Sequence, residues 1–147
     1  MKFWKQFSKQ AVLRQLLFAL LIFALIIPFA LWDSNTQIKV SFGEESVTVK
    51  SDKYSLDIQY ADIVSAELTV LAEAGEKVAD GVDNEILRCG LWKNDAWGEY
   101  YINADLDATD CMLIHTKDGK TFVFNGASNR KTADLFETLQ AHLPSNS

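Results

Sequence analysis

CMLIHTKDGKTFVFN (residues 111–125) contains two alternating apolar runs, separated by Asp118-Gly119. An Asp-Gly pair between such runs is a strong short-range signal for a β-hairpin, because both central residues of a type I′ turn need positive φ. We therefore expect strands over 111–117 and 120–125 that are joined by a type I′ turn. No other segment of the sequence carries as strong a hairpin signal.

Upstream of the hairpin the same alternation recurs in a series of short runs. It predicts strands over 37–42, 46–50, 54–60, 64–71, 86–92 and 97–103, with a short helical corner at 61–63. Residues 72–85 are rich in Glu, Asp, Gly and Lys and show no sustained period. We expect them to form the longest loop and, for that reason, the best candidate contact surface.

Downstream of the hairpin the periodicity becomes helical. Leu135, Phe136, Leu139 and Leu143 fall on one apolar stripe, Ser128 or Asn129 can cap the start, and Pro144 ends the helix. The order predicts a mainly β domain of about seven antiparallel strands, with a C-terminal helix closing one end of a barrel.

The N-terminal region predicts a membrane anchor. Leu16–Trp32 carries no charge, and four cations precede it: Lys2, Lys5, Lys9 and Arg14. We interpret residues 1–10 as a basic cytoplasmic N-terminus, 11–32 as a transmembrane signal anchor in the lipid bilayer, and the rest of the chain as extracytoplasmic. The alternatives are a cleaved signal peptide and a buried soluble helix. The apolar run exceeds a usual signal-peptide core, and no small-x-small cleavage site follows it, which argues against cleavage.

The remainder divides into a linker at 33–36, one domain at 37–143 and a tail at 144–147. Residues 33–147 hold 10 of the 14 Lys and Arg and all 20 Asp and Glu, so their formal charge is −10. Nucleic-acid binding needs a basic footprint, which this domain lacks. An anionic bilayer surface would also repel the domain, whereas a cationic partner would be attracted.

The order of elements resembles the bacterial pleckstrin-homology (PH)-like family, as found in membrane-anchored proteins. The segments that carry the resemblance are YSLDIQYADIVSAEL, LRCGLWKNDAWGEYY with Arg88, Gly90 and Gly98, and MLIHTKDGKTFVFN leading into the helix. The resemblance implies two orthogonal sheets, of four and three strands, and a capping helix. Eukaryotic relatives bind inositol phosphates through a basic first hairpin. Here that tip is Gly43-Glu44-Glu45-Ser46, which argues against phosphoinositide binding.

Several residues are candidates for chemistry or recognition. Asn103, Asp105, Asp107 and Asp110 place oxygen ligands at alternating positions, but Ala108 and Ile114 stand where an EF-hand loop has Gly and Glu, so at most weak Ca²⁺ binding is expected. Trp92 and Trp97 are either an exposed recognition patch or part of a barrel core. Together with the charged residues of the predicted loop 72–85, the two tryptophans form a candidate partner surface. It comprises Glu76, Lys77, Asp80, Trp92 and Trp97.

The two cysteines and two histidines predict no catalytic set. A Cys89–Cys111 disulfide is available in an extracytoplasmic domain, and two separate thiols are the alternative. Cys111 and His115 share one strand face but lie about 13 Å apart along it, too far for a nucleophile–base pair. His142 is expected at the solvent-facing end of the helix, where it can interact with the helix dipole.

These observations predict a non-enzymatic, membrane-anchored module that binds a protein or peptide without a cofactor, by strand addition at an open edge. An envelope sensor or a structural subunit that assembles through its membrane helix is the alternative. A hydrolase would need a cluster of acid, base and nucleophile that the sequence does not display.

Overall fold

The computed structural model describes residues 9–32 and 38–145, and the chain divides into two compact units at residues 36 and 37. The first unit contains one helix, α1 (Lys9–Trp32). Large apolar side chains are exposed at successive positions along it, among them Leu16, Leu17 and Phe18. Within the part of the chain that was searched, namely the described residues, no helix meets the length and hydropathy required to cross a membrane.

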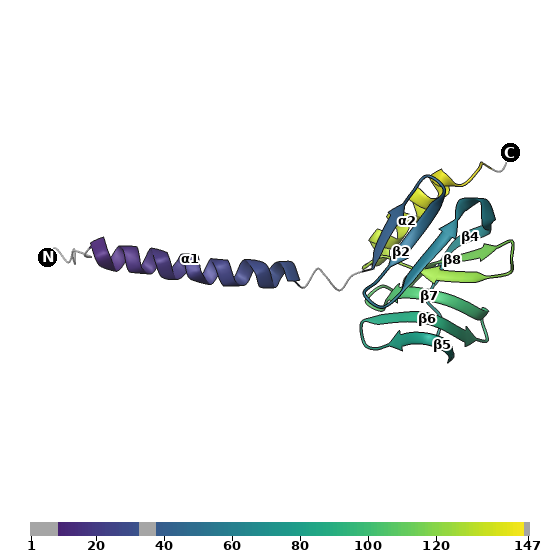
Figure 1. Ribbon diagram of the computed structural model, residues 1–147, viewed down its shortest axis with the longest axis horizontal. Helices are drawn as coiled ribbons and strands as arrows, with labels where there is room; N and C mark the ends of the chain where they lie inside the picture. The colour runs from purple at the N-terminus through teal and green to yellow at the C-terminus, as the bar shows by residue number, and fades with distance from the viewer. Residues whose placement is uncertain (1–8, 33–37, 146–147) are drawn as a thin grey trace. The chain divides into compact units, whose positions relative to one another are not determined.

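The second unit contains two sheets and a C-terminal helix (Figure 1). In the first sheet β1 (Lys39–Phe42), β2 (Ser46–Lys50) and β3 (Ser55–Gln59) are antiparallel neighbours in that order. A 3-10 turn at Tyr60–Asp62 then leads into the second sheet, as the helical corner expected at 61–63 suggested. The mainly β prediction is therefore confirmed in outline.

The second sheet has six strands in the order β4-β8-β9-β7-β6-β5. Figure 1 shows β4, β8, β7, β6 and β5 following one another across the domain. Their bounds are β4 (Ile63–Val70), β5 (Glu76–Asp83), β6 (Leu87–Asn94), β7 (Gly98–Asp105), β8 (Asp110–Thr116) and β9 (Thr121–Phe124).

The predicted barrel of about seven antiparallel strands is wrong in three respects. The described residues form nine strands, β7 and β9 pair in parallel, and the two sheets do not close into a barrel. The one strand outside all of the predicted strand ranges is β5, which lies within the predicted loop 72–85. Its register with β6 shifts twice, between Lys77 and Ala79 and again between Ala79 and Gly81. Each shift interrupts the alternation of side chains, so the segment shows no strand period.

The hairpin at Asp118-Gly119 forms as predicted, but its turn is not type I′. Only Gly119 has positive φ, at 81°, and its N–H donates to the Thr116 carbonyl at 3.0 Å. The Thr116 N–H in turn donates to the Lys120 carbonyl, which closes a longer loop around a left-handed glycine. This arrangement is a type I turn followed by a G1 bulge. Asp118 accepts the Thr116 hydroxyl, and that hydrogen bond lowers the pKa of its carboxyl.

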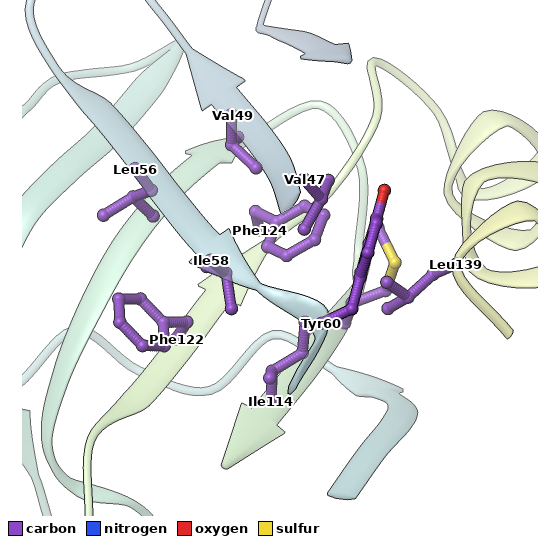
Figure 2. Packing of buried hydrophobic residues seen from close by; sticks show 10 residues of the cluster. Val47, Val49, Leu56, Ile58, Tyr60, Ile114, Phe122, Phe124 and Leu139 are labelled. Carbon is purple, nitrogen blue, oxygen red and sulfur yellow. The ribbon is translucent and has the colours of Figure 1, made fainter. Parts of the chain in front are cut away.

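The first hydrophobic core lies between the three-stranded sheet, the six-stranded sheet and α2 (Asn129–His142). Figure 2 shows Leu139 of α2 pointing toward the strand side chains, with Phe124 and Tyr60 nearby. The Ser128 hydroxyl accepts the Lys131 N–H and caps the helix, as one of the two predicted caps. Leu135, Phe136 and Leu143 pack against the same core, so the predicted stripe is confirmed.

A second core lies on the opposite face of the six-stranded sheet. It contains buried residues of four strands: Trp92, Tyr100, Ile102, Ala104, Cys111, Leu113 and Val123. Leu71 and Ala74 of the β4–β5 connection pack against it. This connection, residues 71–75, joins the two opposite edge strands of the sheet. The six Cα steps from Val70 to Glu76 span about 21 Å at most. In a flat six-stranded sheet, the five spacings between the edge strands β4 and β5 would take about 24 Å. The sheet must therefore curl around its second core.

Side chains from the sheet hold this crossing segment by its backbone carbonyls. The Tyr100 hydroxyl donates to Ala74 O at 2.6 Å, Asn94 Nδ2 to Glu73 O at 3.0 Å, and Arg88 Nη1 to Ala72 O at 3.3 Å. Burial raises the pKa of Tyr100 above its ordinary value near 10, so the hydroxyl stays a donor beyond neutral pH. Residues 71–75 are thus a strap fastened across the second core.

Candidate functional site

The predicted partner surface is only partly assembled on the outside of the domain. Glu76, Lys77 and Asp80 are exposed on β5, the edge strand of the six-stranded sheet. Trp92 pairs with Lys77 across the β5–β6 ladder, but its side chain is buried and its Nε1 donates to Cys89 O at 2.9 Å. Trp97 is half-buried and packs edge-on against Tyr100, with ring centroids 5.1 Å apart. The two indoles therefore belong to the second core, not to a recognition patch.

The edge of β5 is poorly shaped for pairing with another strand. β5 contains two bulges. Its Asp80 also adopts positive φ, at 29°, where the Asp80 carbonyl closely approaches Gly90 of β6. Charged side chains occupy half of its eight positions. Bulges and charges of this kind are the devices by which natural edge strands avoid adding a neighbour.

The oxygen-rich residues of the predicted Ca²⁺ loop do not converge on a common point. Asn103 is buried and donates from Nδ2 to Val49 O and Tyr54 O, which ties the two sheets together. Asp105 is also buried and accepts the Asp107 N–H at 2.9 Å. Burial raises the pKa of the Asp105 carboxyl, against a lowering contribution from that hydrogen bond. Among the described residues no group of three or more His, Cys, Asp or Glu could hold a metal ion.

Cys89 and Cys111 are two separate buried thiols, in accordance with the alternative that the sequence left open. They lie on β6 and β8, with β7 and β9 between them, so about 14 Å of sheet separates their strands. A disulfide needs Cα atoms within about 7 Å. Burial raises the pKa of the Cys111 thiol to about 12, so it is not poised as a nucleophile.

The two histidines lie apart from the cysteines. His115 is exposed on β8, and its Nδ1 lies 3.1 Å from the Thr121 hydroxyl. His142 is exposed at the end of α2, as predicted, and its Nδ1 lies 2.8 Å from Thr138 O. Its ring also stacks on Phe42 and Tyr60, which the sequence did not reveal. His142 therefore fastens α2 to the first sheet.

The other edge strand of the six-stranded sheet is β4, at the opposite side of the sheet from β5. Among the described residues β4 pairs only with β8, in an unbroken register from Ser65 to Val70. The Leu71 N–H donates to Thr109 O at 2.7 Å, which identifies Leu71 and Thr109 as a hydrogen-bonded pair. Hydrogen-bonded and non-hydrogen-bonded pairs alternate along an antiparallel ladder. Counting back from Leu71, the residues Ser65, Glu67 and Thr69 therefore direct their N–H and C=O groups toward β8.

The alternate residues Ala66, Leu68 and Val70 therefore direct their N–H and C=O groups away from β8, toward the free edge. The β8–β9 ladder agrees with this assignment. The Thr116 N–H donates to Lys120 O, so by alternation Met112, Ile114 and Thr116 direct their backbone groups toward β9. The β8 residues between them direct theirs toward β4. Leu68 is 40% exposed and Val70 is 66% exposed, so this edge is both apolar and unpaired.

An open hollow adjoins the beginning of the same edge. It has a volume of about 450 Å³ and is lined by Ile63, Val64, Ser65 and Ala66 from β4, by Gln140 from α2 and by Leu143, Pro144 and Ser145 just after that helix. Val64 stands at the bulge that opens β4 and is 64% exposed. The edge and the hollow together form a continuous surface with apolar side chains and free backbone groups.

Comparisons of the chain with protein-family models, with curated proteins and with solved structures found no match.

Proposed function

We propose that this protein is a non-enzymatic, membrane-anchored interaction module that binds an extended peptide segment of a partner protein by strand addition at β4. The observation that carries the proposal is the outward direction of the backbone groups of Ala66, Leu68 and Val70. A peptide that pairs there extends the six-stranded sheet by one strand. The exposed side chains of Leu68 and Val70 supply the apolar contacts beside it.

Two features favour β4 over the other strand edges. β1 and β3 are short, with four and five residues, and β5 is bulged and charged. β4 has eight residues and only one irregularity, at its start. The hollow beside Val64 also offers space for side chains at one end of an added strand.

The proposal includes the membrane anchor at residues 11–32, with the domain outside the cytoplasm. It is supported by the uncharged run Leu16–Trp32 in α1, by the four preceding cations and by apolar side chains exposed at successive positions along the helix. Protease added to spheroplasts should digest the domain without permeabilisation. A domain that is protected until the membrane is opened would contradict this orientation.

Kinship with the bacterial PH-like family also remains part of the proposal. It is supported by the succession of strands, the Tyr60–Asp62 turn, the Asp118-Gly119 hairpin and the final helix. The non-enzymatic part of the proposal is supported by the burial of the Cys111 thiol, by the separation of Cys111 and His115 by four positions on β8, and by the placement of Cys89 three strands away on β6.

Strand addition is tested with proline at one outward-facing position. Leu68→Pro removes an N–H that points to the free edge and spares the β4–β8 ladder. The matched control is Ser55→Pro, which stands at an outward position of β3. The probe is a labelled seven-residue peptide that alternates valine and serine, added to the full-length chain in a neutral detergent.

Fluorescence anisotropy should show that the wild type and Ser55→Pro bind the probe, whereas Leu68→Pro weakens binding at least tenfold. Circular dichroism must show that both variants remain folded. Equal binding by folded Leu68→Pro and wild type, or no binding by any of the three proteins, would overturn the proposal.

A further inference from the structure

We infer that the segment bound at β4 is basic, with Lys or Arg alternating with apolar residues. This inference rests on the proposed strand addition and specifies the chemistry of the partner. The two faces of an added strand meet different surroundings. On one face it lies beside Ala66, Leu68 and Val70, and on the other beside Ser65, Glu67 and Thr69. One face therefore favours apolar side chains, and the other favours polar ones.

The polar face carries an available negative charge. Glu67 is exposed at the middle of β4, opposite Leu113 of β8. The ion pairs among the described residues are Arg88–Asp83 and Lys120–Asp118, so Glu67 takes part in neither. A cation on the added strand can approach the Glu67 carboxylate without first displacing another cation.

Acidic residues also flank both ends of the edge. Asp62 is exposed just before β4, and Asp110 is the β8 residue paired with Val70. A cation, Lys117, follows the last β8 residue of this ladder, and its N–H donates to Asp62 O. With a formal charge of −10 on residues 33–147, the domain attracts a basic segment over a distance and repels an acidic one.

The same charges argue against a second copy of this chain as the occupant. Two domains of charge −10 would have to meet edge to edge. A two-fold axis centred on Glu67 would also place this carboxylate directly opposite its symmetry mate, which is destabilising in a cross-strand pair.

The experiment compares three seven-residue peptides that alternate valine with lysine, with serine or with glutamate. Each is titrated into the full-length chain in a neutral detergent at low salt. We expect the lysine peptide to bind about tenfold tighter than the serine peptide, and the glutamate peptide to bind weakest. Because exposed charges are screened, the difference should shrink at high salt.

Glu67→Gln should weaken the lysine peptide about two- to fivefold, as expected for one exposed ion pair, and leave the serine peptide unchanged. The matched control is Glu85→Gln, at an exposed position outside β4, which should change neither affinity. Equal affinity for all three peptides would overturn this inference and leave strand addition intact. Failure of every peptide, or a dimer that Leu68→Pro dissociates, would overturn both.

Discussion

The side chain of Asn125 continues the pairing of β9 with β7 beyond the last strand residue. Its Oδ1 accepts the Asp105 N–H at 2.7 Å, and its Nδ2 donates to Asp105 O at 2.9 Å. The same Nδ2 donates to Asp110 O at 3.2 Å, at the start of β8. Asn125 is fully buried, so one amide side chain joins the ends of three strands where water does not reach.

Asn125→Ala should therefore be strongly destabilising. It leaves the Asp105 N–H and C=O without this partner in a buried position, at a cost of about 1–3 kcal/mol for each unsatisfied group. We expect a loss of about 3 kcal/mol in the free energy of unfolding, measured by urea denaturation. The control is Asn129→Ala, which removes exposed hydrogen bonds to Thr109 and Asp110. An equal loss in the two variants would contradict the assigned role of Asn125.

Gly90 is required by its backbone conformation and by its neighbour. Its φ is 110°, and a Cβ atom there would collide with the Asp80 carbonyl. Gly90→Ala should cost about 3 kcal/mol or more, because strain and collision add. Gly98 also has positive φ, at 68°, but faces open space. Gly98→Ala should cost only about 1 kcal/mol. Thermal unfolding of the two variants measures the difference, and a similar cost for both would contradict the close β5–β6 approach.

The cysteines should be unreactive in the folded protein. Both are buried, and the pKa of Cys111 is raised to about 12, so hardly any thiolate forms at pH 8. Iodoacetamide should modify neither thiol in native conditions and both in urea without a reductant. Mass spectrometry counts the adducts. A denatured, unreduced chain without adducts would indicate a disulfide and contradict the separation of Cys89 from Cys111.

Asp105 should lower the free energy of unfolding as pH rises. Burial raises the pKa of its carboxyl above the unfolded value, so the folded state holds the proton more tightly. The contribution of this group to stability is therefore present at low pH and is lost as pH rises through the folded pKa. Asp105→Asn keeps an acceptor for the Asp107 N–H and removes the titration.

The stability of Asp105→Asn relative to the wild type should accordingly increase as pH is raised from about 4. Urea denaturation at a series of pH values measures this change. Asp52→Asn, at an exposed position, is the control for general charge effects. A relative stability of Asp105→Asn that stays flat or falls with rising pH would contradict the burial of this carboxyl.

Local patterns in the sequence predicted most of the elements but not their neighbours. The alternating runs gave β2 and β8, and the Leu135–Leu139 stripe gave α2, because each signal lies within a few residues. The turn at Gly119 was misassigned because Asp-Gly also fits a bulged loop with one left-handed residue. β5 was missed because its two bulges interrupt the alternation that identifies a strand.

The candidate site depended on long-range order that no local pattern contains. Any open sheet has edge strands, but the sequence does not show which strands these are. β4 is an edge strand because β8 and β9 lie between it and β7. The sequence left Trp92 open between a surface patch and a core, and the fold buries it in the second core, against which Leu71 and Ala74 of the strap pack. The contact surface predicted at residues 72–85 lies largely on β5, whereas the edge that suits strand addition is that of β4.

Amide hydrogen exchange along β4 tests strand addition most directly. In the free chain the N–H groups of Ala66, Leu68 and Val70 should exchange quickly, and those of Ser65, Glu67 and Thr69 slowly. On binding of the lysine peptide, the three fast amides should become protected while the slow ones stay unchanged. Uniform protection along β4 in the free chain, or binding without any slowing at Leu68, would contradict the account.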